Sequence, residues 1–225
     1  MRWQIHHFDT VVSTNQTAYA FPTDSVVVAK HQSGGRGRYG RVWESPVGNL
    51  YLSAVVGDYG AQTPLLAFVV GVAVAEALSD YSVRLKWPND VLLNGRKIAG
   101  ILLEKADDCR TIIGIGVNVA SCPTEGMLYE TACLGEGIFI AEVEKRILKS
   151  LHKNLTLFET KGFDDIRKQW LMYAIGLGEY ITVRLPDKQI SGTFKELSPD
   201  GALVLATSDK TCFITAGDVF FNKGN

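Results

Sequence analysis

The sequence KIAGILLE, residues 97–104, is followed after a short polar gap by TIIGIGVNV, residues 111–119, and we expect both segments to be strands. With a period of two residues, Gly114, Gly116 and Asn118 share one face of the second strand. Glycines in a strand mark a close approach by a ligand or by another backbone, and Asn118 adds a directional polar group. The face is therefore a candidate binding surface, although a sheet crossing or a bulge would leave the same pattern.

Further strands and helices are expected on both sides of this pair. Apolar, β-branched segments predict strands at Ser25 to Lys30, Leu50 to Val56, Val83 to Trp87 and Val91 to Leu93. Capping residues, Ala-rich composition or apolar residues at helical spacing predict helices after Ser13 or Thr14, at Pro64 to Leu78, at Glu142 to Phe158 and at Asp164 to Tyr173.

The composition changes near Gly176-Leu177-Gly178, after which short β segments alternate with turns. Strands are expected at Tyr180 to Leu185, Ile190 to Leu197, Leu203 to Ala206 and Cys212 to Thr215. The predicted fold class is therefore α+β. A mixed β-sheet domain with flanking helices occupies residues 1–176, and a small β-barrel module occupies residues 177–225.

Composition limits the function classes. The chain has 225 residues, 46% of them hydrophobic, and a net charge of −1, without the basic excess of a general nucleic-acid-binding surface. Cys109, Cys122, Cys133 and Cys212 form no C-x-x-C pair, and we expect reduced thiols and no directly bound metal. The N-terminus lacks the apolar region of a signal peptide, and no uninterrupted apolar run has the length of a membrane span. We expect a soluble, cytoplasmic protein that binds no membrane.

The segment QSGGRGRYGRVW, residues 32–43, is called the Gly/Arg loop here. Its glycines allow close approach to a ligand, Arg36 and Arg38 offer forks for phosphate or carboxylate oxygens, and Trp43 offers a face for a purine base. It is not a Walker A loop, and it lacks the βαβ setting of a dinucleotide fingerprint. A flexible surface loop or an RNA-contacting loop remains an alternative.

Two further polar segments interrupt apolar sequence. In KWPND, residues 86–90, Asn89 could bond a phosphate or a metal-bound water, and Asp90 could hold an incoming amine. Lys97 opens an apolar strand, where its ammonium would act strongly in dry surroundings. A polar turn after a strand, and a turn lysine beside Asn94-Gly95, are the plainer explanations.

The order of these segments is more specific than any one of them. S-T-N at residues 13–15, then the Gly/Arg loop, K-W-P-N-D, R-K-I-A-G-I-L-x-E and G-I-G-V-N together resemble the biotin protein ligase family. The resemblance implies a catalytic domain of the class II synthetase-like type and a C-terminal SH3-like barrel. It implies an ATP-dependent ligase that forms biotinyl-5'-AMP and transfers biotin to a lysine of a biotin carboxyl carrier protein, a post-translational modification.

The resemblance also implies roles for individual residues. Biotin would contact Ser13, Thr14, Asn15, Gln32, Gly35, Arg36, Arg38, Lys97, Gly100 and Gly114. ATP would contact Arg36, Arg38, Arg41, Trp43, Asn89, Lys97 and Asn118. The catalytic residues would be Lys97, Arg38 and Asp90. Mg²⁺ would arrive with ATP, without a direct protein ligand, and would lie near Asn89.

Several expectations qualify this resemblance. Lys97 and Gly100 are three apart, so a regular strand places them on opposite faces. Both can reach one pocket only if the chain bends between them or if Gly100 contributes backbone alone, and we favour the second alternative. Tyr39 stands where the family often has another Arg.

The S-T-N motif comes too early for a preceding helix-turn-helix, so we expect a short form that binds no DNA, as a monomer or weak homodimer. A lipoate or octanoate ligase or transferase of the same superfamily is the alternative enzyme, and a non-enzymatic nucleic-acid-binding protein is the alternative class.

Overall fold

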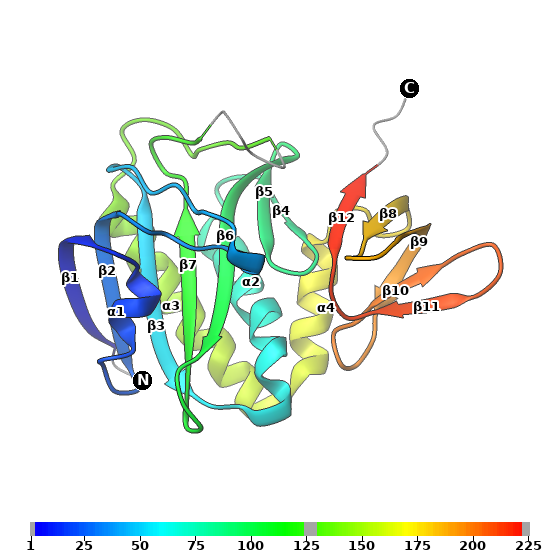
Figure 1. Cartoon of the computed structure of the whole chain (residues 1–225), viewed down its shortest axis with the longest axis horizontal. Coiled ribbons are helices and arrows are strands. Elements are labelled where there is room, and N and C mark those ends of the chain that lie inside the picture. Colours follow the sequence, from blue (N-terminus) through cyan, green and yellow to red (C-terminus); the bar gives the residue numbers. More distant parts are fainter. Residues whose placement is uncertain (1–2, 124–129, 222–225) are drawn as a thin grey trace.

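The computed structural model describes residues 3–123 and 130–221. It contains a seven-stranded sheet followed along the chain by a five-stranded sheet (Figure 1). Helices cover the first sheet, whereas the second sheet stands beside it at the C-terminal end. The arrangement confirms the predicted α+β fold class.

The first sheet has the strand order β1-β2-β3-β7-β6-β5-β4. Strands β1 and β2 pair in parallel, and the remaining neighbours pair antiparallel, so the sheet is mixed as predicted. The strands are β1 (Gln4–Val11), β2 (Ser25–Gln32), β3 (Leu50–Gly57), β4 (Val83–Lys86), β5 (Asp90–Leu93), β6 (Arg96–Lys105) and β7 (Arg110–Val117).

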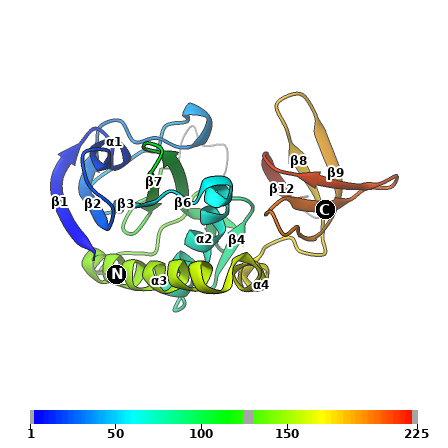
Figure 2. The ribbon, with the colours of Figure 1, turned by 90° about the horizontal axis from the view of Figure 1, so that it is seen from below.

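Helices α2 (Leu66–Ala77), α3 (Ile140–Lys161) and α4 (Phe163–Tyr173) lie together on one side of this sheet. Figure 2 shows α3 along that side and the short helix α1 (Thr14–Ala18) on the opposite side. The expected long helices are thus confirmed, with α2 preceded by a 3₁₀ turn (Gly60–Leu65) that contains Pro64. The side that carries α1 remains open to ligands.

The stretch Gly60–Ala77 is long and apolar enough to cross a membrane by length and composition alone. In the fold, however, most of α2 is buried in the main hydrophobic core, where it packs against α3 and α4. Its apolar residues lie on every side of the helix, which is the pattern of a core helix enclosed between two layers.

The second sheet pairs antiparallel in the order β11-β10-β9-β8-β12 and confirms a small all-β module. Its strands are β8 (Tyr180–Arg184), β9 (Gln189–Leu197), β10 (Leu203–Ala206), β11 (Thr211–Ile214) and β12 (Asp218–Phe221). The Trp87 indole donates to the Gly201 carbonyl at 3.2 Å, so the module is anchored to the end of β4.

Candidate active site

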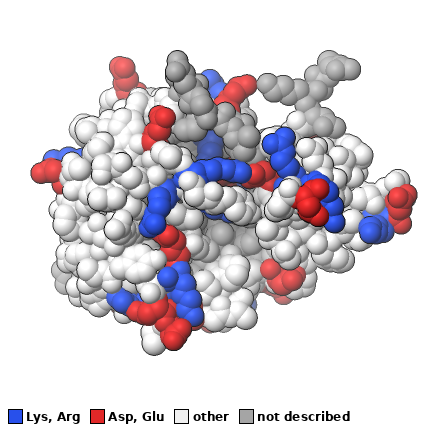
Figure 3. All heavy atoms as spheres, in the orientation of Figure 1, with Lys and Arg blue, Asp and Glu red and all other residues white. Residues whose placement is uncertain are grey.

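A cavity of about 630 Å³ lies between the first sheet, the start of α1, the Gly/Arg loop and the edge of the second sheet. Figure 3 shows Lys and Arg side chains, mixed with acidic ones, over the middle of this face. The structure brings nearly all predicted site residues to the cavity wall. They are Ser13, Thr14, Asn15, Gln32, Arg36, Arg38, Arg41, Trp43, Asn89, Asp90, Lys97, Gly100, Gly114 and Asn118.

Gly35 is the predicted contact residue that is not part of this wall. A Cβ at Gly35 would lie 2.6 Å from the Ser45 hydroxyl oxygen, and it would also collide with the Trp43 carbonyl. The glycine is therefore needed for packing inside the Gly/Arg loop, because a side chain there would push the two arms of the loop apart.

Three glycines, called here the glycine floor, line the cavity where β6 and β7 meet: Gly100, Gly114 and Gly116. The Asn15 amide lies on Gly114, and a Cβ at Gly116 would lie 2.7 Å from the Trp43 indole nitrogen. The glycines of the predicted common face thus make room for the Asn15 amide and the Trp43 ring, which form part of the cavity wall.

Of the two alternatives for Lys97 and Gly100, the favoured one is wrong and the chain bends between them. The register between β5 and β6 shifts at this point, because Val91 pairs with Ala99 while Leu92 pairs with Lys97. The extra residue makes a β-bulge, which turns the Lys97 side chain onto the face of Gly100. The Lys97 ammonium would consequently lie 3.3 Å from a Cβ at Gly100.

Trp43 covers part of the glycine floor. Its ring lies against Gly100 and Gly116, and the Lys97 ammonium is 5.3 Å from the ring centroid, a cation–π distance. The indole nitrogen is buried and has no hydrogen-bond partner in the described part of the chain. The Trp43 ring therefore forms an aromatic wall of the cavity, beside the charged end that contains Lys97 and Asp90.

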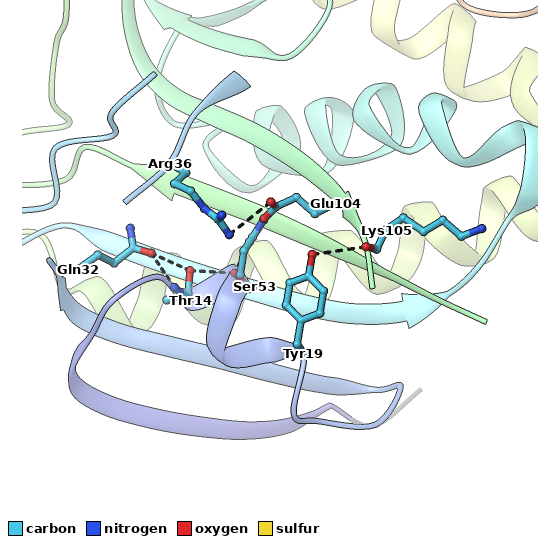
Figure 4. Close-up of polar contacts among 8 residues, drawn as sticks. Thr14, Tyr19, Gln32, Arg36, Ser53, Glu104 and Lys105 are labelled. Atoms are coloured by element: carbon cyan, nitrogen blue, oxygen red, sulfur yellow. Dashed lines mark hydrogen bonds and ion pairs between the residues drawn. The ribbon is translucent and has the colours of Figure 1, made fainter. Parts of the chain in front are cut away.

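Hydroxyl and amide groups form what we call the polar chain, through Asn15, Ser53, Thr14, Gln32 and Ser45. Figure 4 shows its middle part, from Ser53 through Thr14 to Gln32. The Thr14 backbone N–H and hydroxyl donate to Gln32 Oε1 at 2.8 and 3.0 Å. Gln32 Nε2 lies 2.9 Å from the Ser45 hydroxyl, which donates to the Trp43 carbonyl at 2.9 Å. The chain therefore presents fixed donors and acceptors to a small polar head group.

Sequence analysis did not assign Ser45, Ser53 or Glu104 to this site. Ser53 is fully buried within β3, and a single hydroxyl residue among apolar neighbours was the available signal. Glu104 closes the R-K-I-A-G-I-L-x-E segment, where it accepts a 2.6 Å hydrogen bond from Asn15 Nδ2. Arg36 Nη2 lies 3.4 Å from the other carboxylate oxygen of Glu104.

At the opposite end of the cavity, Asp90 faces two ammonium groups. Lys97 Nζ is 2.6 Å from Asp90 Oδ1, and Lys86 Nζ is 4.0 Å from Asp90 Oδ2. Burial lowers the pKa of Lys86 to about 8, while the charge of Asp90 opposes that shift and the charge of Lys97 adds to it. The cluster combines an acceptor for an amine with a cation for developing negative charge.

Arg38 of the Gly/Arg loop is held by two hydrogen-bond partners, Asn89 and Tyr39. Arg38 donates to Asn89 Oδ1 at 3.0 Å, and Asn89 Nδ2 donates to the Ile101 carbonyl at 2.7 Å. Arg38 also donates to the Tyr39 hydroxyl at 2.9 Å. Tyr39, which stands where the family often has another Arg, therefore supports the loop. Arg38 and Asn89, which were predicted separately, thus form one hydrogen-bonded unit beside Asp90 and Lys97.

The second sheet contributes residues that sequence analysis missed. Asp218 and Arg184 line the cavity, and Arg41 donates to both Asp218 oxygens at 3.2 and 2.6 Å. Burial raises the pKa of Asp218, but the hydrogen bond from Arg41 and the nearby positive charges outweigh it, so the pKa is lower than usual.

Asn118 lies behind the glycine floor at the end of β7. Its Nδ2 donates to the Ala132 carbonyl at 3.1 Å, whereas its Oδ1 is buried and has no hydrogen-bond partner within residues 3–123 and 130–221. Because a buried acceptor without a donor is costly, this oxygen suits a ligand that brings an N–H group.

Comparison with known proteins gives two family matches. Residues 9–119 match the Biotin/lipoate A/B protein ligase family, and residues 176–222 match the Biotin protein ligase C terminal domain. The chain is 34% identical over 214 residues to the biotin–[acetyl-CoA-carboxylase] ligase of Paracoccus denitrificans, covering 87% of this chain and 89% of that protein.

A second relative is the bifunctional ligase/repressor BirA of Bacillus subtilis, with 34% identity over 237 residues, 96% of this chain and 73% of that protein. The fold also resembles the biotin protein ligase from Aquifex aeolicus solved in complex with biotin and ATP. That match has a TM-score of 0.85 and 30% identity, and covers 96% of this chain and 97% of the other. The chain therefore belongs to the biotin protein ligase family.

Proposed function

We propose that the protein activates biotin with ATP to form biotinyl-5'-AMP and transfers the biotinyl group to a lysine of a biotin carboxyl carrier protein. The observation that carries this proposal is the single cavity that joins the polar chain, the glycine floor and the cationic side chains. Biotin has a compact ureido head and a carboxylate tail, and these two parts match the two ends of the cavity.

The first step joins biotin to the nucleotide. The head group lies at Ser13, Thr14, Asn15 and Gln32, and the tail reaches Lys97 along Gly100 and Gly114. A biotin carboxylate oxygen attacks the α-phosphorus of ATP, and the bond to pyrophosphate breaks. Lys97 and the loop arginines, Arg36, Arg38 and Arg41, neutralise the charge that develops on the phosphoryl oxygens.

The adenine base stacks on Trp43, whose ring forms the wall beside the charged end. The unpartnered Oδ1 of Asn118 accepts a hydrogen bond from the base, because the exocyclic amine of adenine is a donor. Asn89 lies near the phosphates through its bond to Arg38. These assignments place ATP between the Gly/Arg loop and β7.

The donor set fits Mg²⁺ that arrives with ATP. Both oxygens of Asp90 face lysines, and the described residues contain no group of three His, Cys, Asp or Glu side chains that could hold a metal. Mg²⁺ commonly keeps its waters and binds through substrate phosphates, so it would need no direct protein ligand and would lie near Asn89. The ion neutralises phosphate charge when it is bound.

The second step transfers biotin to the carrier. The lysine amine of the carrier attacks the acyl carbon of the adenylate, the bond to AMP breaks, and the amine loses a proton. Asp90 orients the amine and accepts that proton, because Lys97 can shift from Asp90 toward the phosphate once the adenylate has formed. Solvent then receives the proton from Asp90.

We also propose that the protein is a monomer or weak homodimer, that it lies in the cytoplasm and that it acts on a carrier protein. The cysteines of the described residues are free thiols, which supports a reducing compartment. We also propose the division into residues 1–176 and 177–225, because the second sheet begins at Tyr180.

The test is incubation with biotin, Mg·ATP and a biotin carboxyl carrier domain, followed by mass spectrometry of the carrier. We expect one biotinyl group on one lysine, only when ATP is present. Melting temperatures with biotin and with lipoate separate the alternative enzyme, because a ligand that binds only the folded state stabilises it. A carrier without added mass, or a melting temperature raised only by lipoate, would overturn the proposal.

A further inference from the structure

We propose that Glu104 is a positioning residue, which orients the Asn15 amide of the polar chain and makes a weaker contact with Arg36 of the Gly/Arg loop. This inference rests on the proposed function, because it concerns how the head group of biotin is recognised. Nothing in the catalytic steps above uses Glu104.

Glu104 reaches the site indirectly. Gly100, Leu102 and Glu104 alternate along β6 and share one face, and the first two of them line the cavity while Glu104 does not. The Glu104 side chain is 22% exposed and lies beyond the end of the glycine floor. A substrate in the cavity would therefore meet Asn15 and Arg36 rather than Glu104 itself.

The two carboxylate oxygens serve different partners, as Figure 4 shows for Arg36. Oε2 accepts the 2.6 Å bond from Asn15, whereas Oε1 lies 3.4 Å from Arg36, whose side chain is 47% exposed. A short charge-assisted bond in a partly buried place is stronger than a long ion pair in solvent. The contact with Asn15 is consequently the dominant one.

The charge of Glu104 decides which way the Asn15 amide faces. With Nδ2 toward Glu104, Asn15 Oδ1 lies 2.6 Å from the Ser53 hydroxyl and accepts its proton. The reversed amide would place Oδ1 against a carboxylate and Nδ2 against the hydroxyl. The Ser53 hydroxyl can accept from an amide N–H as well as donate, so its contact does not select an orientation. The carboxylate can only accept, so the contact with Glu104 selects the orientation in which Nδ2 faces it.

The orientation of Asn15 continues along the polar chain. The Ser53 hydroxyl has one proton and two acceptors within reach, Asn15 Oδ1 at 2.6 Å and Thr14 Oγ1 at 2.8 Å. While Asn15 presents its oxygen, Ser53 donates to it and the Thr14 hydroxyl oxygen stays open to another donor. A ureido head group has both N–H donors and a carbonyl acceptor, so this fixed polarity suits it.

The decisive variant is Glu104→Gln, which keeps the shape and removes the charge. The glutamine amide can accept from Asn15 or turn its oxygen toward Arg36, but it cannot satisfy both donors with one oxygen. We expect biotin alone to bind about tenfold more weakly by calorimetry, equivalent to about 1.4 kcal/mol. We expect the KM for ATP to stay within about twofold, because the tether to Arg36 is weak.

Two further variants separate positioning from general damage. Asp108→Asn removes an exposed carboxylate at the β6–β7 turn that pairs with Lys105, and should leave biotin binding unchanged. In the double variant Asn15→Ala with Glu104→Gln, the second change should cost little, because the amide that Glu104 orients is gone. Glu104→Asp retains the charge and should recover part of the affinity.

The outcomes are distinct. Biotin affinity of Glu104→Gln within about twofold of wild type, or fully additive losses in the double variant, would overturn the positioning role. A loss of affinity shared by Asp108→Asn would overturn it as well. Wild-type protein that binds no biotin in the same calorimeter would instead refute the proposed function, and the inference with it.

Discussion

At the scale of single residues, Lys86 is the least expected member of the site. It is 4% exposed at the end of β4, and burial lowers its pKa to about 8. Its ammonium lies behind Asp90, on the side away from Lys97. The carboxylate is therefore held between two cations, one of which lines the cavity and one of which does not.

Replacing Lys86 with Met should change the pH dependence of stability. Below pH 8 the folded protein bears the cost of a buried ammonium, whereas above pH 10.5 the amine is neutral in both states. The stability of wild type relative to Lys86→Met should rise by up to about 3 kcal/mol between about pH 8 and pH 10.5. Urea unfolding of both proteins across this range measures it, and a flat or falling difference would contradict the assignment.

Replacing Lys97 with Ala should impair chemistry more than binding. The ammonium meets charge that develops on the phosphoryl oxygens, so adenylate formation should slow by about 10² or more. Biotin affinity should change by less than about threefold, because the head group lies at the other end of the cavity. Single-turnover kinetics and calorimetry give the two numbers. Lys105→Ala on the same strand is the control, and equal losses in both measurements would argue against a role in the transition state.

At the scale of elements, periodic segments were predictable and irregular ones were not. The strands β6 and β7 and their glycine face followed from alternation, because those strands lie in the middle of the sheet. Strand β1 was missed, since this edge strand is largely exposed and contains His6, His7 and Asp9 instead of alternating apolar residues. The bend beside Lys97 was one of two alternatives but not the favoured one, because a bulge depends on the pairing partner as well as on the strand itself.

Replacing Gly116 of the glycine floor with Ala should weaken ATP binding, because it adds a methyl group beside Trp43. The new Cβ in Gly116→Ala would lie 2.7 Å from the Trp43 indole, so the ring must move. We expect the KM for ATP to rise about tenfold while biotin affinity changes little. Steady-state kinetics tests this, with Gly57→Ala as control, because a Cβ there meets nothing within 4 Å. Unchanged ATP kinetics would show that Trp43 does not depend on this glycine.

At the scale of the whole molecule, the site joins segments that no local pattern connects. Arg41 and Asp218 are 177 residues apart, yet they form a two-pronged ion pair at the cavity. Motif order predicted the residues from Ser13 to Asn118, because each motif carries unusual residue types. Asp218 and Arg184 lie in ordinary short strands, so their place became visible only when the two sheets were brought together.

Replacing Asp218 with Asn should weaken ATP binding from the second sheet. Arg41 would lose its charged partner and move more freely, so the KM for ATP should rise about two- to fivefold, as expected for a partly exposed ion pair. Biotin affinity should stay at the wild-type value. Asp209→Asn, an exposed change in the same module, is the control. Weaker biotin binding with unchanged ATP kinetics would contradict this role for the C-terminal module.

The fluorescence of Trp43 should report ligand binding in the cavity. The chain has four tryptophans; Trp87 and Trp170 are buried in the core, and Trp3 donates to the Leu148 carbonyl away from the site. A nucleotide stacked on Trp43 should therefore change mainly the emission of one indole, and Trp43→Phe should abolish the change. The order in which biotin and ATP enter could then be followed in real time by stopped-flow fluorescence, without a label on either substrate.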